Sequence, residues 1–256
     1  MKTNRNTVGE REHEFAARLA EDAGRLLLGI RDSGSTADEI RAEGDRRSHE
    51  FLVSALANEF PHDAWLSEEA PPDSSRLNAG RVWIVDPLDG TREFGETGRT
   101  DWAVHVALVA DGAPVVGAVA LPAEGATLSA HRPPTVPSRT NEKIRLAVSR
   151  TRPTPLALSL AERLHADLVP MGSAGAKIAA VVRGEVDVYA HTGGQYEWDS
   201  AAPVAVALAA GLHASRINGA ALRYNQQDPW LPDLLVCRPE LADGVLGALT
   251  EVSAGL

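Results

Sequence analysis

Apolar residues recur along this chain with two periods, one typical of helices and one typical of strands. Over residues 10–30 they follow a helical period, which predicts a helix with Leu19 and Leu27 on its buried face. A second amphipathic helix is expected to follow Asp45, which stands where an N-cap residue would. Its inward residues would be Phe51, Leu52, Ala55 and Leu56. Short apolar runs before residue 121 predict strands at 64–67, 82–85, 102–109 and 115–120.

The pattern changes near the middle of the chain. Residues 122–141 are rich in Pro, Ser and Thr, and strands and helices alternate after them. The elements expected there are strands at 144–148, 168–170 and 186–190, helices at 156–164, 174–182 and 199–210, and a hairpin with Asn218-Gly219 at its turn. We therefore expect an N-terminal α+β domain of residues 1–140 and a C-terminal α/β domain of residues 141–256.

Composition narrows the possible partners. A chain of 256 residues with a formal net charge of −10 can bury a sizeable core but would repel a nucleic-acid polymer. Cys237 is the only cysteine, which excludes an internal disulfide. The polar N-terminal segment lacks the apolar core of a signal peptide, and no apolar run reaches the length of a membrane span. We expect a cytoplasmic protein that acts on a small molecule, without a membrane partner.

The strongest chemical signal follows the strand at 82–85, where the chain reads Asp86-Pro87-Leu88-Asp89-Gly90-Thr91 after an upstream Ser67-Glu68-Glu69. Pro and Asp-Gly favour a tight turn, so two carboxylates and the Leu88 carbonyl are expected on one side of a loop. Oxygen ligands suit Mg²⁺, while Gly90 and Thr91 would let an anion approach closely. An isolated Asp-Gly turn is more often structural. The combination with a buried strand and Glu-Glu favours a metal-dependent phosphatase.

Two further segments could complete such a site. Asp199 opens the last predicted helix, either as its N-cap or as a third carboxylate of a metal cluster. In the segment 172–177, Gly-Ser-Ala-Gly-Ala-Lys, Ser173 and Lys177 stand at the start of a helix, as an anion contact or as a cap and a surface lysine. The eight histidines have no zinc-like spacing, and His105 is interpreted as an ordinary strand residue.

These motifs together resemble the lithium-sensitive inositol monophosphatase superfamily. Its pattern is Glu-Glu, then Asp-Pro-Ile/Leu-Asp-Gly-Thr, then Trp-Asp-x-Ala-Ala, and this chain carries it at residues 68–69, 86–91 and 198–202. The resemblance implies a layered αβαβα sandwich, α+β and α/β in class, of the type found in inositol monophosphatase and fructose-1,6-bisphosphatase. Residues 92–94, 172–177 and 222–225 look most like the actinobacterial CysQ type, a 3′(2′),5′-bisphosphate nucleotidase of sulfate assimilation that hydrolyses 3′-phosphoadenosine 5′-phosphate (PAP).

The resemblance also implies roles for individual residues. It implies two or three Mg²⁺ ions, whose ligands would be Glu68, Asp86, the Leu88 carbonyl, Asp89 and Asp199. The implied catalytic residues, which position a metal-activated water for attack on phosphorus, are Asp45 at the start of a helix, Glu68 and Thr91. The implied substrate contacts are Leu88, Asp89, Gly90, Thr91, Arg92, Ser173, Lys177 and Asp199.

Two departures from the family pattern bear on this expectation. Ala42-Glu43-Gly44 stands where the family has Thr-x-Ala, and the upstream lysine that is common in the family is missing. Both differences bear on the third Mg²⁺ site. His191 stands where many CysQ-type proteins carry an arginine associated with the second phosphate of the nucleotide. We expect hydrolysis of PAP to AMP and phosphate. The alternatives are inositol monophosphate or fructose 1,6-bisphosphate as the substrate, or a non-catalytic metabolite-binding regulator. A homodimer is common in the family.

Overall fold

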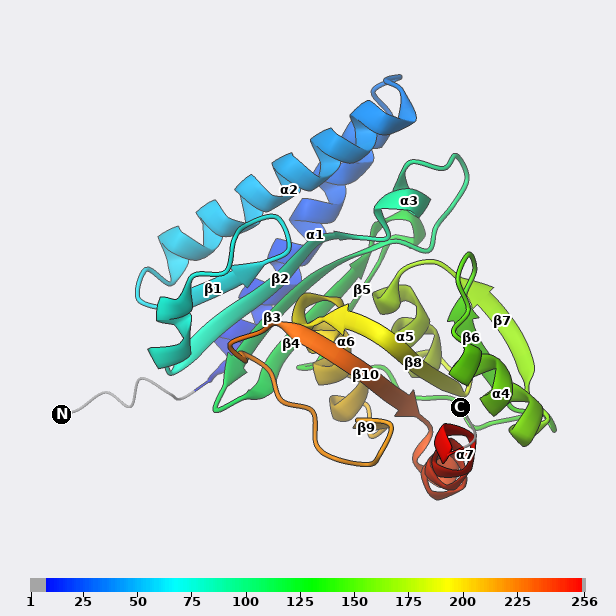
Figure 1. Ribbon diagram of the computed structural model, residues 1–256. Coiled ribbons are helices and arrows are strands. Elements are labelled where there is room, and N and C mark those ends of the chain that lie inside the picture. The colour runs from blue at the N-terminus through cyan, green and yellow to red at the C-terminus, as the bar shows by residue number, and fades with distance from the viewer. Residues whose placement is uncertain (1–7, 255–256) are drawn as a thin grey trace.

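The computed structural model describes residues 8–254 and arranges the strands in two five-stranded sheets (Figure 1). The first sheet has the order β1-β2-β3-β4-β5, with β1 parallel to β2 and antiparallel pairing elsewhere. Its strands are β1 (Ala64–Ser67), β2 (Arg81–Asp89), β3 (Ala103–Ala110), β4 (Ala113–Leu121) and β5 (Ala126–Ser129).

The second sheet is mixed and has the order β7-β6-β8-β10-β9. Strand β6 is parallel to both of its neighbours, whereas β10 is antiparallel to β8 and β9. Its strands are β6 (Arg145–Ser149), β7 (Asp167–Met171), β8 (Val188–Tyr196), β9 (His213–Ser215) and β10 (Trp230–Cys237).

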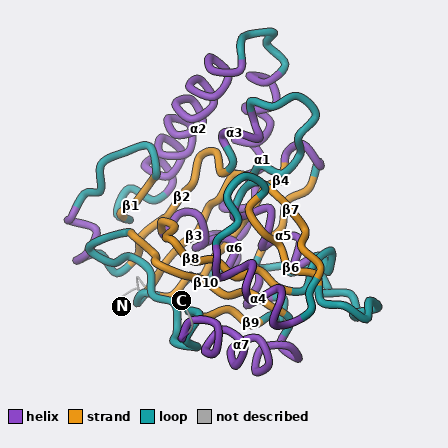
Figure 2. The backbone as a smooth tube through the Cα atoms, turned by 45° about the vertical axis from the view of Figure 1, so that its right-hand side comes forward, coloured by secondary structure: helices purple, strands orange, loops and turns teal. Residues whose placement is uncertain are grey.

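Helices form three layers around the two sheets (Figures 1 and 2). Helices α1 (Glu10–Arg31) and α2 (Ala37–Glu59) cover the outer face of the first sheet. Helices α5 (Ala174–Val182) and α6 (Glu197–Ala209) lie between the sheets, and α4 (Pro155–Leu164) and α7 (Ala242–Ala254) cover the second sheet from outside. The short helix α3 (Thr91–Phe94) follows β2. The expected αβαβα layering is therefore confirmed.

Side chains along β2 point alternately to the two faces of the first sheet, and both faces are covered by helices. Trp83 and Val85 pack with α1 and α2, whereas Val82 and Ile84 pack with α5 and α6. A strand that is buried on both faces reads as a continuous apolar run, which is the pattern that identified it. Gly117 of β4 lets α6 approach closely, because an added Cβ would lie 2.5 Å from the Cβ of Ala205.

The predicted start of the second helix is wrong. Helix α2 begins at Ala37, because the Thr36 side chain accepts a hydrogen bond from the Glu39 N–H and the Glu39 carboxylate accepts one from the Thr36 N–H. Asp45 therefore lies inside the helix and caps nothing. Leu52 and Leu56 are buried as predicted, but Phe51 is 37% exposed, so the prediction that it turns inward is wrong.

Other boundaries differ in detail. Strand β2 continues through the motif to Asp89, with irregular pairing to β3 after Asp86, where Pro87 has no N–H to donate. Strands β9 and β10 pair as expected, but residues 216–229 connect them and the Asn218-Gly219 turn lies inside that connection. Strand β5 and helix α7 were not predicted.

The predicted domain boundary at residue 140 falls in the connection between β5 and β6. Helices α5 and α6 share one apolar cluster with both sheets. The division into two domains stays a prediction. None of the helices within residues 8–254 combines the length and the apolar character of a membrane span.

Candidate active site

Acidic side chains from three segments meet where β2 ends. Asp86 and Asp89 belong to β2, Glu68 directly follows β1, and Asp199 lies in the first turn of α6. Because β1 and β2 are parallel, their carboxyl ends lie at the same edge of the sheet, which places Glu68 beside Asp86. Glu68 and Asp86 are close enough for each to affect the pKa of the other.

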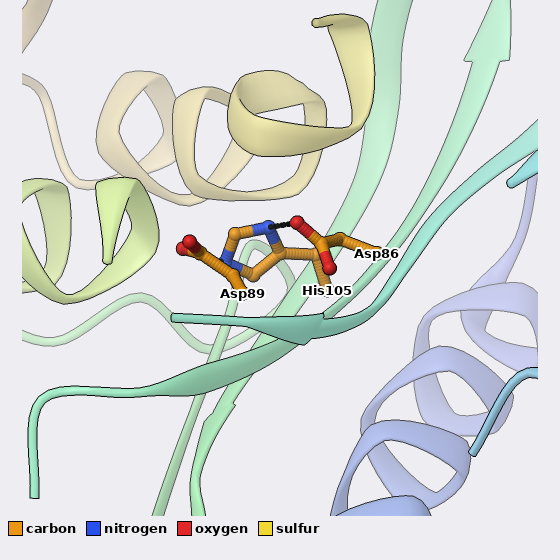
Figure 3. A group of neighbouring side chains, drawn as sticks. All are labelled: Asp86, Asp89 and His105. Atoms are coloured by element: carbon orange, nitrogen blue, oxygen red, sulfur yellow. Dashed lines mark ion pairs between the residues drawn. The ribbon is translucent and has the colours of Figure 1, made fainter. Parts of the chain in front are cut away.

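Asp86 has a carboxylate oxygen without a partner. Its side chain is 1% exposed; Oδ1 accepts a hydrogen bond from the Leu88 N–H at 3.1 Å, whereas Oδ2 has no hydrogen-bond partner among the described residues. The Nδ1 atom of His105, its partner across the ladder, lies 3.9 Å from Oδ2 (Figure 3). Burial, followed by the negative charge of Glu68, raises the pKa of Asp86 well above its usual range.

Asp89 holds the start of helix α5. Its Oδ2 accepts hydrogen bonds from the Ser173 hydroxyl and the Gly175 N–H at 2.5 Å each, and its Oδ1 accepts one from the Ala174 N–H at 3.1 Å. Burial acts to raise the pKa of Asp89, but the close contact with His105 and the hydrogen bonds from Ser173 and Gly175 outweigh it and keep the pKa below its usual value. Asp89 thus also anchors the start of α5, because the first amides of a helix favour an anion. The sequence did not reveal this structural role.

Asp199 lies two residues inside α6, which begins at Glu197, so its predicted N-cap position is wrong. Its Oδ2 instead accepts a hydrogen bond from the Tyr196 N–H at 2.6 Å. Burial and the charge of Asp89 raise the pKa of Asp199 to about 6. The pKa of Glu68 is raised to about 7, first by loss of hydration and then by the charge of Asp199.

This donor set fits a divalent cation. The carboxyl groups of Glu68, Asp86 and Asp199 lose hydration and repel one another, and Asp86 has an oxygen without a partner. A positive ion in their midst would relieve both costs, and carboxylate oxygens are the ligands that hard cations prefer. Asp86, Asp89 and His105 each offer one ligand atom, and these atoms lie within 4.8 Å of one another (Figure 3).

Thr91 links the motif to helix α2. Its Oγ1 lies 3.1 Å from the Leu88 carbonyl and 3.4 Å from Oδ1 of Asp45. Burial and the charge of Glu69 raise the pKa of Asp45 to about 6. Gly44, which stands where the family pattern has Ala, has a steric role. An added Cβ would lie 2.8 Å from the ring of Phe94 and would keep α2 away from this loop. The expected juxtaposition of Asp45 and Thr91 is present, although Asp45 reaches it from the middle of a helix.

Gly90 satisfies the backbone requirement of this loop. Its φ is +88°, in the left-handed region, and an added Cβ would lie 3.0 Å from the Cβ of Ser173. The chain can therefore turn sharply from β2 into α3 against the start of α5.

A cavity of about 360 Å³ lies next to the acidic side chains, and most of the expected substrate contacts line it. These are Asp89, Gly90, Thr91, Arg92, Ser173, Lys177 and Asp199. Leu88 does not line the cavity, and its side chain is buried. The Lys177 ammonium donates to the Gly172 and Ser173 carbonyls at 2.7 Å each, and burial lowers its pKa. Two of its three N–H groups are therefore used inside the protein.

Sequence reasoning missed His105. Its imidazole is fully buried, with Nδ1 3.0 Å from the Trp198 carbonyl and Nε2 3.3 Å from Oδ2 of Asp89. Burial would lower the pKa of His105, but the close contact with the Asp89 carboxylate raises it. Only the pairing register of β2 and β3, which places it opposite Asp86, could have shown its position.

The acidic cluster should make the stability of the metal-free protein depend on pH. The folded protein binds protons more tightly than the unfolded chain at Asp45, Glu68 and Asp199, whose pKa values are about 6, 7 and 6. These groups therefore lower the free energy of unfolding as pH rises from about 4 to about 7. Asp89, with a lowered pKa, contributes stability that is lost only in stronger acid, outside this window.

Divalent ions compete with protons for these carboxylates. We expect saturating Mg²⁺ to raise the melting temperature by several degrees at pH 8 and by much less at pH 5. Thermal unfolding at the two pH values, with Mg²⁺ or with a chelator, measures the difference. An equal effect of Mg²⁺ at both pH values would contradict this account of the cluster.

Comparison with known sequences gives a family match over most of the chain. The model of the inositol monophosphatase family matches residues 10–253. A 3′-phosphoadenosine 5′-phosphate phosphatase of Mycobacterium leprae (strain TN) is 52% identical over 253 residues, covering 93% of this chain and 93% of the relative. The 3′(2′),5′-bisphosphate nucleotidase CysQ of Escherichia coli (strain K12) is 29% identical over 234 residues, covering 83% of this chain and 94% of the relative.

Solved structures agree with this match. CysQ from Bacteroides thetaiotaomicron superposes with a TM-score of 0.77 at 28% identity, covering 90% of this chain and 97% of that one. Inositol monophosphatase II from Staphylococcus aureus MSSA476 has a TM-score of 0.79 at 19% identity, covering 93% and 95%, which is a likeness of fold alone. The fold class expected from the motifs is confirmed.

Proposed function

The chain belongs to the inositol monophosphatase family, and we propose that it is a Mg²⁺-dependent phosphatase that hydrolyses PAP to AMP and phosphate. The observation that carries the chemistry is the group of Asp86, Asp89 and His105, whose ligand atoms lie within 4.8 Å of one another beside the cavity. Glu68 and Asp199 are near enough for their charges to raise the pKa of Asp86. The choice of PAP is supported by the 52% identity to the mycobacterial phosphatase. The substrate is thus a small phosphorylated molecule.

The acidic side chains and the Leu88 carbonyl would hold two Mg²⁺ ions. Such ions, when bound, neutralise charge on the phosphate and lower the pKa of a water molecule. We propose two ions and not three because Ala42-Glu43-Gly44 stands where the family has Thr-x-Ala, a difference that bears on the third metal site. A homodimer and a cytoplasmic location stay predictions.

Asp45 and Thr91 would orient the attacking water. The Thr91 hydroxyl has one proton, which it can donate to Oδ1 of Asp45 or to the Leu88 carbonyl. Its oxygen can then accept a hydrogen bond from water, so the water is turned with its own oxygen toward phosphorus. Because the pKa of Asp45 is about 6, its carboxylate is ionised and accepts this bond above that pH.

A phosphate-release assay tests this proposal. We expect kcat/KM for PAP to exceed that for inositol 1-phosphate and for fructose 1,6-bisphosphate by about tenfold or more, and release from each to require Mg²⁺. A higher value for inositol 1-phosphate or fructose 1,6-bisphosphate would transfer the assignment to that substrate. Binding of PAP without release of phosphate would favour a metabolite-binding regulator and overturn the catalytic proposal.

A further inference from the structure

Few arginines of this acidic protein have a free guanidinium. Nearly all of those within residues 8–254 form an ion pair or donate to a backbone carbonyl. The side chains of Arg92, Arg132 and Arg152 have neither kind of partner in this part of the chain.

Arg92 and Arg152 line the same cavity, beside the acidic cluster. Arg92 is the second residue of α3, and Arg152 lies in the connection between β6 and α4. Both side chains are exposed, and two guanidinium groups at one cavity attract anions to it. Their planar donor groups match the oxygens of a phosphate, which can accept two hydrogen bonds from each.

Neighbouring carboxylates do not neutralise these arginines. Glu93, which also lines the cavity, is paired with Arg150 at 2.8 Å. Asp101 is paired with Arg99 and accepts a hydrogen bond from the Gly172 N–H. The positive charge of Arg92 and Arg152 therefore remains available to a ligand.

The other basic groups of the cavity are poorly suited to a second anion. The Lys177 ammonium is held by two backbone carbonyls. The imidazole of His191 has its Nε2 3.1 Å from the Gly194 carbonyl, and burial lowers its pKa, so it is uncharged at neutral pH. Neither group offers a free positive charge, so a second phosphate in this cavity needs another partner.

Resting on the proposed function, we propose that Arg92 and Arg152 form a second anion subsite. They bind the phosphate that is not hydrolysed, and they select doubly phosphorylated substrates over monophosphates. The scissile phosphate lies at the acidic cluster, beside Asp89 and Asp199, while the second phosphate lies at the arginines. A cavity of about 360 Å³ is within the range of small-ligand sites.

Adenosine 3′-monophosphate tests the subsite, because it is PAP without the 5′-phosphate. We expect Arg152→Gln and Arg92→Gln each to lower kcat/KM for PAP about 10- to 100-fold, mainly through KM. Arg152→Gln should leave kcat/KM for adenosine 3′-monophosphate unchanged within about twofold. Arg132→Gln is the matched control, since this arginine is also exposed and unpaired but does not line the cavity. It should change neither value.

Equal losses for PAP and adenosine 3′-monophosphate, or no loss for either, would overturn the subsite. Fructose 1,6-bisphosphate serves as a third substrate. If its kcat/KM falls as that of PAP does, the arginines recognise a second phosphate without regard to the nucleoside, which also supports the subsite.

A binding measurement separates failure of the subsite from failure of the proposed function. Calorimetry in a chelator, where the ligands stay intact, compares the Kd of PAP with that of adenosine 3′-monophosphate. We expect the wild type to prefer PAP and the Arg152→Gln variant to lose that preference. Absence of phosphate release from PAP by the wild type would refute the proposed hydrolysis, but a Kd ratio that depends on the arginines would still support the subsite. A ratio that Arg152→Gln leaves unchanged would overturn it.

Discussion

Asp86→Asn is expected to lower the turnover of PAP at least about a thousandfold, because a bound metal contributes several kcal/mol of transition-state stabilisation and each 1.36 kcal/mol is tenfold in rate. The variant should remain folded. Asparagine keeps the oxygen that accepts from the Leu88 N–H, and it removes a buried charge whose other oxygen has no partner among the described residues. Steady-state phosphate release and a melting curve in chelator measure both effects.

Two further variants sharpen this test. Asp167→Asn is the matched control, because its carboxylate is exposed and paired only with Lys143, so turnover should be unchanged. Asp89→Asn should lose turnover and also stability, since its carboxylate holds the first amides of α5. Turnover of Asp86→Asn within tenfold of the wild type would contradict the metal role.

The second large effect is expected at Thr91. Thr91→Val should lower kcat about 100-fold or more with little change in KM, because it removes the hydroxyl that orients the attacking water. Thr91→Ser is the matched control and should retain most of the activity, since it keeps the hydroxyl. Steady-state kinetics with PAP measure both variants.

Asp45 should act through the same hydroxyl. The double variant Asp45→Asn with Thr91→Val should therefore be no slower than Thr91→Val alone by more than about threefold. Fully additive losses would show that the two residues act independently and that the 3.4 Å contact between them has no catalytic role.

The sequence predicted the parts of the site that depend on local patterns. The run 82–85 identified a buried strand, and the motif that follows it carried the acidic residues and the glycine with positive φ. Gly90 illustrates why this works, because a turn requirement can be read from a single residue type. The αβαβα layering came from the resemblance, since periodicity alone does not fix the order of layers.

The features that were missed depend on contacts between distant segments. Asp45 was placed at a helix start because its local pattern allowed it, but the capping box of Thr36 and Glu39 starts the helix earlier. His105 became part of the site only through its register opposite Asp86. Arg152 joins the cavity because β6 ends beside it, which no short-range pattern shows.

The roles of Glu68, Asp86, Asp89 and Asp199 as metal ligands can be tested by diffraction from crystals that contain Mn²⁺. Anomalous scattering locates this ion directly, and Mn²⁺ prefers the same oxygen ligands as Mg²⁺. We predict peaks within coordination distance of these carboxylate oxygens, next to the cavity. Peaks only at other surfaces, or an acidic cluster without a peak at saturating Mn²⁺, would contradict a shared metal site.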